Sequence, residues 1–537
     1  MIYINQIFFK IFNQLRKFYL YSNYYDKKIS KVNSKEFIYK PSPHLLASLI
    51  RYQKKKIRID DFSVNEIWSH NNLDKKEYRN LNSFYWFFSL DLKSSKKTTQ
   101  SVISDWIKNN YKYNHKSWDF DITAKRIISW LSCHNLSYDE SDTNYRYNFN
   151  KIIQKQTNHL IHEINKSEYI DDKLIGCASI ILVGLCYQNE KNYLSFGSSL
   201  LKKITKIPLD DYSFPKSRNI KQLILYLKYF ILIREWFKES QINIPEYIDE
   251  TIFHLGQGYA FFAKSSGCNF LFNGNNITDN NNFDNYLKRL GYKFNSDDHE
   301  FGGYIILNNK KVCLSMDIGS TPNPKFTQDY QSGALSFEII SNGKKLISNC
   351  GYYKKKGNKL NLLSKSSATH TTLIIDDNSS CKFTKEQNSF LIKNGLKTNK
   401  KNIVFEKNLW KINVSHDGYL KRYNSIHERE IEFYPEEMKF IGIDKIIKIK
   451  TNHSYKFDIR FHVEPNIKLM KTQDNKTILI ELDDEGWKFT CDNYDINIDN
   501  GLYFGNKNLY SENQNIFITG ISNNQTENIR WQISKLK

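Results

Sequence analysis

The feature that most constrains the fold is a change in hydrophobic periodicity near Gly291. Before it, from about Pro43 to Leu290, apolar residues recur every three or four positions, which is the spacing of one helix face. After it, short apolar runs alternate with turn-forming residues, which is the pattern of strands and hairpins. The sequence therefore predicts a helical half followed by a β half.

The helical spacing is clearest in residues 101–109, 122–131, 149–164 and 220–237. Helices of roughly 10–18 residues joined by short polar loops favour antiparallel helix pairs, as in a solenoid or an α/α toroid. Leu174–Cys186 is the longest apolar run. It is too short to cross a bilayer and predicts a buried helix.

The β half contains two hairpin signals, Asn308-Asn309 and Asn342-Gly343. The second is the stronger, because Asn-Gly supplies the positive φ angles of a type I′ turn. Further short strands with turn signals continue to the C-terminus and predict a large antiparallel β-sandwich. We therefore expect an α+β multidomain protein. Its parts would be an N-terminal helical extension (1–42), an incomplete α/α toroid (43–290) and a β-sandwich (291–537).

The charge of the chain favours an anionic partner. In 537 residues, 78 Lys and Arg face 57 Asp and Glu, a net charge of +21. Such a charge suits an acidic polysaccharide, nucleic acid or a membrane surface, and the 35 Tyr and 35 Phe suit a groove that stacks on sugars or bases. A coding bias toward Lys, Asn, Ile, Tyr and Phe accounts for part of the excess lysine. The basic run Lys54-Lys55-Lys56 is typical of a solvated face.

Cysteine spacing and the N-terminus exclude several classes. No two of the eight cysteines form a Cys-x-x-Cys pair, so a zinc knuckle, a redox motif and a disulfide framework are not expected. Residues 1–21 place Ile, Phe and Leu at helical spacing but lack an apolar region followed by a small-residue cleavage site. We expect an ordinary packing helix there, with a helix lying on a membrane surface as the alternative.

A series of short strings adds a resemblance to these patterns. The strings are Trp118-Asp119-Phe120, Arg126-Ile127-Ile128-Ser129-Trp130, Phe270-Leu271-Phe272-Asn273-Gly274, Gly302-Gly303-Tyr304, Asp317-Ile318-Gly319, Leu335-Ser336-Phe337-Glu338, Asn349-Cys350-Gly351, Ala368-Thr369-His370-Thr371-Thr372, His416-Asp417-Gly418-Tyr419, His427-x-Arg429 and Arg460-Phe461-His462. Their order over most of the chain resembles the heparinase II/III-like family of polysaccharide lyases.

The resemblance implies cleavage of an acidic polysaccharide by β-elimination, without a cofactor. The C5 proton of a uronic acid is too weakly acidic to leave unless its carboxylate is neutralised. A base, usually His or Tyr, then removes the proton, and an acid, usually Tyr, protonates the leaving glycosidic oxygen. In the family, the toroid groove holds the anionic chain and the β-sandwich supplies histidines.

The toroid half departs from the family at two places. The family's Asn-His pair corresponds to Asp172 and Lys173, and the Tyr of its Ser-Pro-x-Tyr-His segment corresponds to Gln222. Gln has no titratable proton, so it cannot replace that Tyr as base or acid. The preceding Arg is retained as Arg218, and Tyr226, one helical turn beyond Gln222, could project from the same face.

The β half departs at the positions that bind a structural zinc in some members of the family. They correspond here to Gln331, Asn349 and His370. One imidazole with two amides is a poor zinc site. We therefore expect no tightly held zinc.

Nine residues are candidates for the site. The candidate catalytic residues are His370, Arg218 and Tyr226, and the candidate substrate-binding residues are Asn219, Gln222, Gln331, Asn349, His416 and Arg429.

Structural alternatives stand beside four of these candidates. His370 could be a core histidine bonded to a backbone carbonyl, and His416 could belong to a tight turn. Asn219 could be no more than a helix N-cap. His427 and Arg429 would share one face of a strand whose other face carries Glu428, Glu430 and Glu432, so a solvated charge ladder is as good an interpretation as carboxylate recognition.

Three functions remain open. The first is a lyase acting on a uronic-acid polymer, and the second is a catalytically silent protein that binds an anionic glycan. The third, nucleic-acid binding, rests on charge alone, because no helix-turn-helix, RRM, KH or zinc-finger signature is present. Nucleotide-binding, serine-hydrolase and zinc-protease motifs are also missing. The family resemblance implies a cell-envelope or periplasmic location, with the cytoplasm as the alternative because no clear signal peptide is present.

Overall fold

The computed structural model describes most of the chain. The described residues are 14–31, 37–45, 73–91, 93–187, 191–266, 269–278, 280–355, 357–386, 389–450, 453–506 and 510–536. The run Lys54-Lys55-Lys56 and residues 1–13 of the predicted N-terminal helix lie outside them. The chain forms two compact units, one helical and one built of strands.

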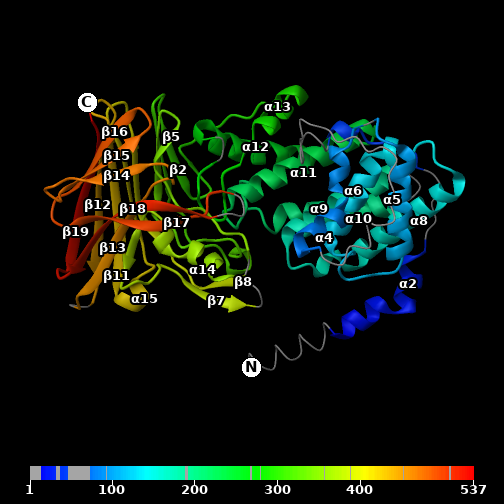
Figure 1. Cartoon of the computed structure of the whole chain (residues 1–537), viewed down its shortest axis with the longest axis horizontal. Coiled ribbons are helices and arrows are strands. Elements are labelled where there is room, and N and C mark those ends of the chain that lie inside the picture. The colour runs from blue at the N-terminus through cyan, green and yellow to red at the C-terminus, as the bar shows by residue number, and fades with distance from the viewer. Residues whose placement is uncertain are drawn as a thin grey trace. The chain divides into compact units, whose positions relative to one another are not determined.

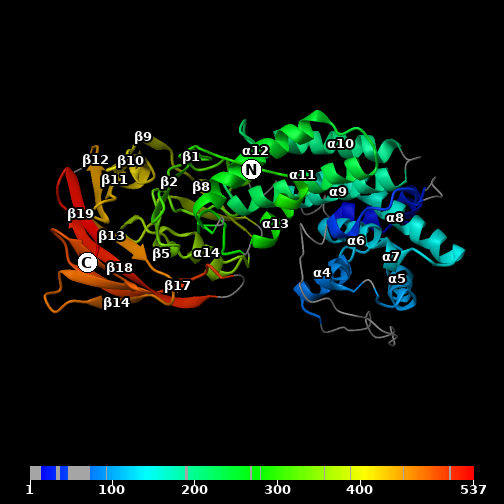
Figure 2. The ribbon, with the colours of Figure 1, turned by 90° about the horizontal axis from the view of Figure 1, so that it is seen from above.

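The helical unit spans residues 1–209, 225–253 and 281–293. Neighbouring helices pack along their lengths, as α9 and α10 do (Figure 2). The described helices of the unit are α2 (Asn23–Ile29), α4 (Lys75–Ser83), η1 (Tyr85–Ser89), α5 (Lys96–Asn110), α6 (Phe120–Ser132), α7 (His134–Ser137), α8 (Thr143–Glu163), η2 (Ile164–Lys166), α9 (Ile170–Cys186), α10 (Lys191–Lys206), α13 (Asn281–Leu290) and parts of α11 (Ile220–Glu239) and α12 (Glu246–Ser266).

All four strongly periodic segments are helical, within α5, α6, α8 and α11, except that residue 164 falls in η2. The apolar run Leu174–Cys186 is buried at every position within α9, so the prediction of a buried helix is confirmed. In the part of the chain that is described, no helix is both long enough and apolar enough to cross a membrane.

The Arg-Ile-x-x-Trp string of α6 is part of the core. Arg126 is fully buried, with its guanidinium 3.9 Å from the centre of the Trp106 ring. It donates to the backbone carbonyls of Asn82 and Ser117 and to Gln156 Oε1. Three acceptors and an aromatic face thus replace the water that a buried guanidinium loses.

The described part of the N-terminal region packs against the helical unit by one face. Tyr25 and Ile29 are fully buried, and the Tyr25 hydroxyl bonds His159 Nδ1 at 2.8 Å. Arg16 bonds Glu163 at 2.9 Å. The other face remains exposed, including Phe18 at 77%. Residues 14–31 therefore behave as a packing segment.

The strand unit spans residues 210–224, 254–280 and 294–537. Its sheets (Figure 1) are antiparallel, in the strand orders β1-β2-β3-β4-β5, β14-β15-β16-β19-β12-β11-β10-β9, β17-β18-β13-β6 and β7-β8. The strands are β1 (Glu300–Phe301), β2 (Tyr304–Asn308), β3 (Val312–Asp317), β4 (Phe337–Ser341), β5 (Lys344–Ile347), β6 (Leu373–Ile375), β7 (Lys382–Glu386), β8 (Ser389–Asn394), β9 (Thr398–Phe405), β10 (Trp410–His416), β11 (Ser425–Tyr434), β12 (Lys439–Lys448), β13 (Tyr455–His462), β14 (Lys468–Lys471), β15 (Thr477–Leu482), β16 (Glu485–Cys491), β17 (Ile496–Tyr503), β18 (Ser511–Ser522) and β19 (Thr526–Lys535).

The short helices of this unit are η3 (Pro324–Phe326), α14 (Lys359–Lys365), η4 (Ser367–Thr369) and α15 (Leu420–Tyr423). One hydrophobic core joins the three larger sheets, with Leu307, Trp531 and Ile518 as representatives of each. Both predicted hairpins form, and Asn342 and Gly343 have φ angles of 44° and 80°, as a type I′ turn requires.

The predicted fold class, a helical half followed by an antiparallel β-sandwich, is confirmed. The two compact units alternate along the chain, so α11 and α12 each contribute residues to both. The boundaries at residues 42 and 290 stay a prediction. The described cysteines are free thiols, buried except for the partly exposed Cys491, and Cys268 lies outside the described residues.

Candidate functional site

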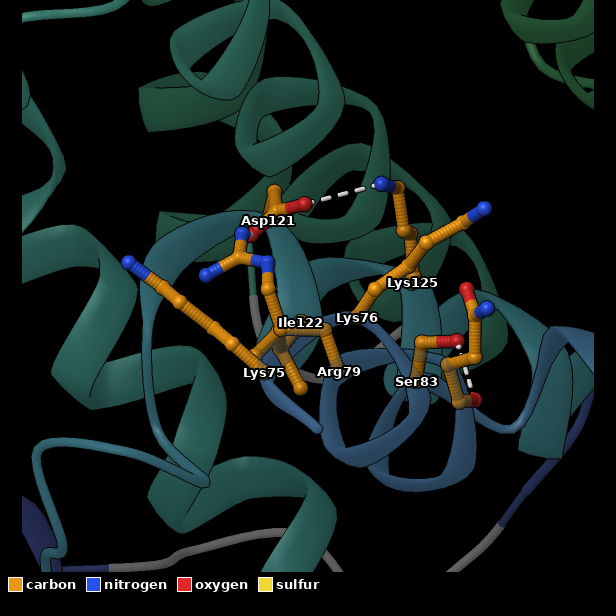
Figure 3. Close-up of a pocket in the computed structure, with 8 residues that line it drawn as sticks. Lys75, Lys76, Arg79, Ser83, Asp121, Ile122 and Lys125 are labelled. Carbon is orange, nitrogen blue, oxygen red and sulfur yellow. Dashed lines mark hydrogen bonds and ion pairs between the residues drawn. The ribbon is translucent and has the colours of Figure 1, made fainter. Parts of the chain in front are cut away.

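A basic pocket lies between α4 and α6 in the helical unit (Figure 3). Its volume is about 340 Å³, and its walls are Lys75, Lys76, Arg79, Asn80, Ser83, Asp121, Ile122 and Lys125. Figure 3 shows Asp121 between Arg79 and Lys125, and it is ion-paired with both. Four cations thus face one carboxylate, and the pocket carries a net positive charge that would attract an anionic ligand.

Local sequence signals place these cations. Asp74 caps α4 and forms a capping box with Glu77, so the helix begins with Lys75 and Lys76 exposed in its first turn. Asp119 is the N-cap of α6, where its side chain accepts from the Phe120 N–H, and it also pairs with Arg79. Although burial alone would lower the pKa of Arg79, its two carboxylate partners raise it. Arg79 is therefore a permanent cation held in place by two anions.

Asp172, in the first turn of α9, is a carboxyl group whose pKa is shifted by its surroundings. Burial, reinforced by the charges of Asp121 and Asp119, raises the pKa of Asp172 to about 7, against the opposing charge of Lys125. Ser167 Oγ lies 3.5 Å from its carboxylate. At neutral pH Asp172 exists in both protonation states, which is the condition for a general acid or base.

Arg218 occupies a socket built by two of the recognised strings, Gly302-Gly303-Tyr304 and Asp317-Ile318-Gly319. Its guanidinium pairs with Asp317 at 2.6 Å and donates to the carbonyls of Gly302, Gly303 and Gly319. A Cβ on Gly319 would lie 2.3 Å from the guanidinium carbon. The glycines therefore make room for the arginine.

The Phe-Asn-Gly turn continues this socket. Asn273 donates to Asp317 and to the Tyr304 hydroxyl, and it accepts from the backbone N–H of Gln331. Gln331 in turn accepts from the Gly274 N–H and donates to the carbonyls of Gly351 and Ser364. Arg218 and Gln331 thus belong to one buried hydrogen-bond network.

The start of α11 carries three more candidates. Asn219 Oδ1 accepts from the backbone N–H groups of Lys221 and Gln222, so Asn219 is the N-cap of the helix. Gln222 accepts from Ser217 Oγ at 2.6 Å. Tyr226, one turn on, is fully buried, its hydroxyl has no hydrogen-bond partner among the described residues, and burial raises its pKa well above the ordinary value.

His370 lies inside the strand unit at 1% exposure. Its Nδ1 donates to the Ser366 carbonyl at 2.8 Å, and burial lowers its pKa to about 4. Its Nε2 is buried beside Gly333 without a hydrogen-bond partner in the described structure. This is the geometry of the core-histidine interpretation, and the catalytic role stays a prediction.

Asn349 and Arg429 converge on the residue after His370. Asn349 Oδ1 accepts from the Thr371 N–H, and Arg429 donates to the Thr371 carbonyl. Arg429 is fully buried and forms a bidentate pair with Asp444. On the opposite face of β11, Lys411 and Lys445 pair with the glutamates, so the predicted division of the two faces is confirmed.

His416 completes this network. The Gly418 N–H donates to His416 Nδ1 at 3.0 Å, which places the His416 proton on Nε2. That nitrogen lies 3.2 Å from His427 Nδ1, and His427 Nε2 lies 2.7 Å from Asp444. The contacts define a directed chain of donors from His416 through His427 to Asp444, and His416 also opens the predicted turn.

The structure thus brings the candidates of the β half into buried networks. The basic pocket and Asp172 are accessible chemistry in the helical unit, and Arg218 lines a further pocket of about 370 Å³ in the strand unit, with Lys216 and Asn323. Asp172 was visible as a departure from the family's Asn-His pair, but its raised pKa depends on neighbours distant in sequence. Lys75 and Lys76 carried no motif. Within the described residues, no cluster of three or more His, Cys, Asp or Glu side chains could hold a metal.

Comparisons with known families and solved structures agree with the fold. Residues 294–532 match the family model "Heparinase II/III-like, C-terminal". A comparison with curated proteins finds no match.

Solved structures match over most of the chain. A crystal structure of heparinase III has a TM-score of 0.70 at 14% identity, covering 98% of this chain and 91% of its own. A mutant of the heparan sulfate lyase HepC from Pedobacter heparinus has a TM-score of 0.68 at 12% identity, covering 96% and 87%. The chondroitin AC lyase of Streptomyces coelicolor A3 has a TM-score of 0.50 at 7% identity, covering 95% and 81%. We conclude that residues 294–532 are a heparinase II/III-like C-terminal domain and that the chain as a whole has the heparinase III fold.

Proposed function

We propose that this protein is a polysaccharide lyase that cleaves an acidic, uronic-acid-containing polysaccharide by β-elimination. The observation that carries the proposal is the basic pocket together with Asp172, a carboxyl group whose pKa is about 7 and which senses the charges of Asp121 and Lys125. The proteins that share the fold bear the names of heparan sulfate and chondroitin lyases, which supports the substrate class.

In this proposal, each requirement of the reaction is assigned to a residue. Lys75, Lys76 and Lys125 would neutralise the uronate carboxylate and so acidify the C5 proton. The ionised form of Asp172 takes that proton, the C5–H electrons form the C4=C5 double bond, and the C4–O bond breaks. The protonated Asp172 then returns the proton to the leaving glycosidic oxygen. One group that is half ionised at neutral pH can serve both steps.

The candidates predicted from the sequence support the scaffold in this proposal. Arg218 donates to Asp317 and to three backbone carbonyls. His370 donates to a backbone carbonyl, and Tyr226 is fully buried in the core. Their catalytic roles stay predictions, as do the substrate-binding roles of the other six.

The test is a continuous ultraviolet assay for unsaturated uronate ends, run on a panel of uronic-acid polysaccharides. We expect Asp172→Asn to lower kcat about 100-fold or more with little change in KM, because it removes proton transfer and retains shape. The control is Glu168→Gln, which also replaces a carboxylate by an amide, at an exposed position four residues before Asp172. The wild-type kcat should rise as the pH increases through about 7, because the ionised form of Asp172 accepts the C5 proton. A wild type that releases no unsaturated product from any polymer would overturn the proposal.

A second candidate is binding without cleavage. It is favoured by Gln222, which stands where catalysis would want a Tyr, and by the burial of Tyr226 and His370. In that case the same panel would show saturable binding, weakened by Lys75→Glu/Lys76→Glu, and no product. Product formation that disappears in Asp172→Asn would reject this candidate.

The proposal also includes the location of the protein in the cell. A lyase or a binder of acidic glycans would meet its ligand in the cell envelope or periplasm. Cell fractionation with an antibody against the native protein tests this, and recovery of the protein only in the cytoplasmic fraction would contradict it.

A further inference from the structure

A second pocket in the helical unit has a different character. Its volume is about 290 Å³. We call it the aromatic pocket, and its walls are Arg16, Lys17, Leu20, Tyr113, His115, Trp118, Asp119, Phe120 and His159. They come from the N-terminal segment 14–21, the loop before α6, the first residue of α6 and the C-terminal part of α8.

One wall of the aromatic pocket is a cluster of rings around His159. The His159 ring centre lies 5.1 Å from that of Tyr113, 5.6 Å from that of Trp118 and 6.0 Å from that of Phe120, with Phe120 stacked at 18°. Burial lowers the pKa of His159 to about 3, so the ring is neutral. The wall is therefore an uncharged aromatic surface with partly exposed edges at Tyr113 and Phe120.

The other wall carries charge. Lys17 is exposed, and the Arg16 side chain is 23% exposed while it pairs with Glu163 at 2.8 Å. His115 is held by a bond of its Nδ1 to the Tyr21 hydroxyl. Asp119, which also lines the pocket, carries carboxylate oxygens that accept from Arg79 and from the Phe120 N–H. The pocket therefore combines exposed Lys17, the carboxylate of Asp119 and an aromatic face within one small volume.

A sugar ring with an acidic substituent fits this combination. The C–H face of a pyranose is apolar and packs on aromatic rings, while its hydroxyls donate to carboxylates. Its carboxylate or sulfate would meet Lys17 and Arg16. A cavity of about 290 Å³ is near the lower end of small-molecule sites, of about 300–1,000 Å³, and suits one substituted ring better than an oligosaccharide.

The aromatic and basic pockets are neighbours. Arg79, in the wall of the basic pocket, pairs with Asp119, in the wall of the aromatic pocket, as well as with Asp121. One ion pair thus links a wall residue of each pocket, which places the two pockets next to one another.

We propose that the aromatic pocket binds a second, non-reacting sugar residue of the acidic polysaccharide held in the basic pocket. This inference rests on the proposed function and adds a subsite to it. Occupying two linked sites makes the second contact intramolecular, so affinity should rise in a step once an oligosaccharide is long enough to span both.

The experiment is isothermal titration of the full chain with size-defined oligosaccharides, from dimers to decamers, of heparin and of polygalacturonate. The test variant is Lys17→Glu/Phe120→Leu, which reverses the exposed charge and removes a ring while retaining apolar volume. We expect it to abolish the length-dependent step, a loss of about tenfold in affinity for the longest oligomers, and to leave dimers unaffected. Lys203→Glu, an equal charge reversal on an exposed position of α10, is the control.

The outcomes separate the two proposals. A step that survives in Lys17→Glu/Phe120→Leu, or the lack of any step in the wild type, overturns the second subsite and leaves the basic pocket in place. Binding of oligomers that is insensitive to Lys75→Glu/Lys76→Glu overturns the role of the basic pocket itself. Loss of the step in the test variant alone supports the inference.

Discussion

At the scale of single residues, Arg218 explains two of the recognised strings, Gly302-Gly303-Tyr304 and Asp317-Ile318-Gly319. A buried guanidinium needs several acceptors, and Asp317 with three glycine carbonyls provides them. Arg218 itself has a φ of 61°, a left-handed conformation that an L-residue adopts at a cost. The strain persists because the socket over-determines the position of the side chain.

Removing this arginine should destabilise the protein strongly. Arg218→Ala leaves Asp317, 1% exposed, as an uncompensated buried charge, so we expect a loss of about 3–5 kcal/mol in the free energy of unfolding. Arg530→Ala is the matched control, because its pair with Asp492 at 3.7 Å is more than half exposed and should contribute less than about 1 kcal/mol. Urea denaturation of both variants measures the difference, and equal losses would refute the socket.

At the scale of elements, β10, β11 and β12 are joined by the chain from His416 through His427 to Asp444. Burial lowers the pKa of His416 well below its ordinary value, with His427 and Arg429 adding to the effect, and burial also lowers the pKa of His427. A protonated His416 would direct an N–H at the Gly418 N–H. The arrangement therefore requires neutral imidazoles.

Stability should consequently fall as the solution becomes acidic. Both folded-state pKa values lie below the unfolded value of about 6.5, so the unfolded chain binds more protons below that pH. The stabilisation is complete above pH 7 and declines as pH falls below about 6.5, by up to about 1.4 kcal/mol per pH unit for each imidazole.

His416→Gln provides the comparison, because its amide can still accept and donate but cannot titrate. We expect a shallower loss of unfolding free energy between pH 7 and 5 than in the wild type, measured by denaturant titration at each pH. Identical slopes would show that folding does not lower the pKa of His416.

Much of the fold could be predicted from periodicity, and the site could not. The type I′ hairpin at Asn342-Gly343 and the buried helix α9 follow from local rules, so both were predictable. His370, Asn349 and Arg429 are polar residues in a recognisable order, but a buried hydrogen-bond network and an active site demand the same residue types. Only the burial of these side chains distinguishes a structural network from an active site. That burial depends on partners such as Ser366 and Asp444, which the strings do not include.

At the scale of the whole molecule, the charge of +21 should govern association with an acidic polymer. Salt screens charges over about 8 Å at physiological ionic strength, so raising NaCl should slow association and leave dissociation less affected. Stopped-flow fluorescence with polygalacturonate at several salt concentrations measures this. An association rate that is independent of salt would mean that the net charge is not used for binding.

The alternation of the two units also limits how the chain can be divided. A fragment 294–537 contains every named strand but lacks segment 210–224, and with it Arg218. We expect it to lose cooperative unfolding, because Asp317 has no cation partner. Circular dichroism during thermal unfolding tests this, and a sharp transition matching that of the full chain would contradict it.

The same alternation sets an order of assembly during synthesis. The helical unit receives its last segment at residue 293, whereas its first ends at residue 209, a difference of 84 residues. At about 5–20 residues per second, the ribosome needs roughly 4 to 17 s to supply the rest. Arg218 meanwhile leaves the ribosome about a hundred residues before Gly319, the last of its partners. Neither unit can therefore finish folding as an independent N-terminal module, and the nascent chain must hold both incomplete at once.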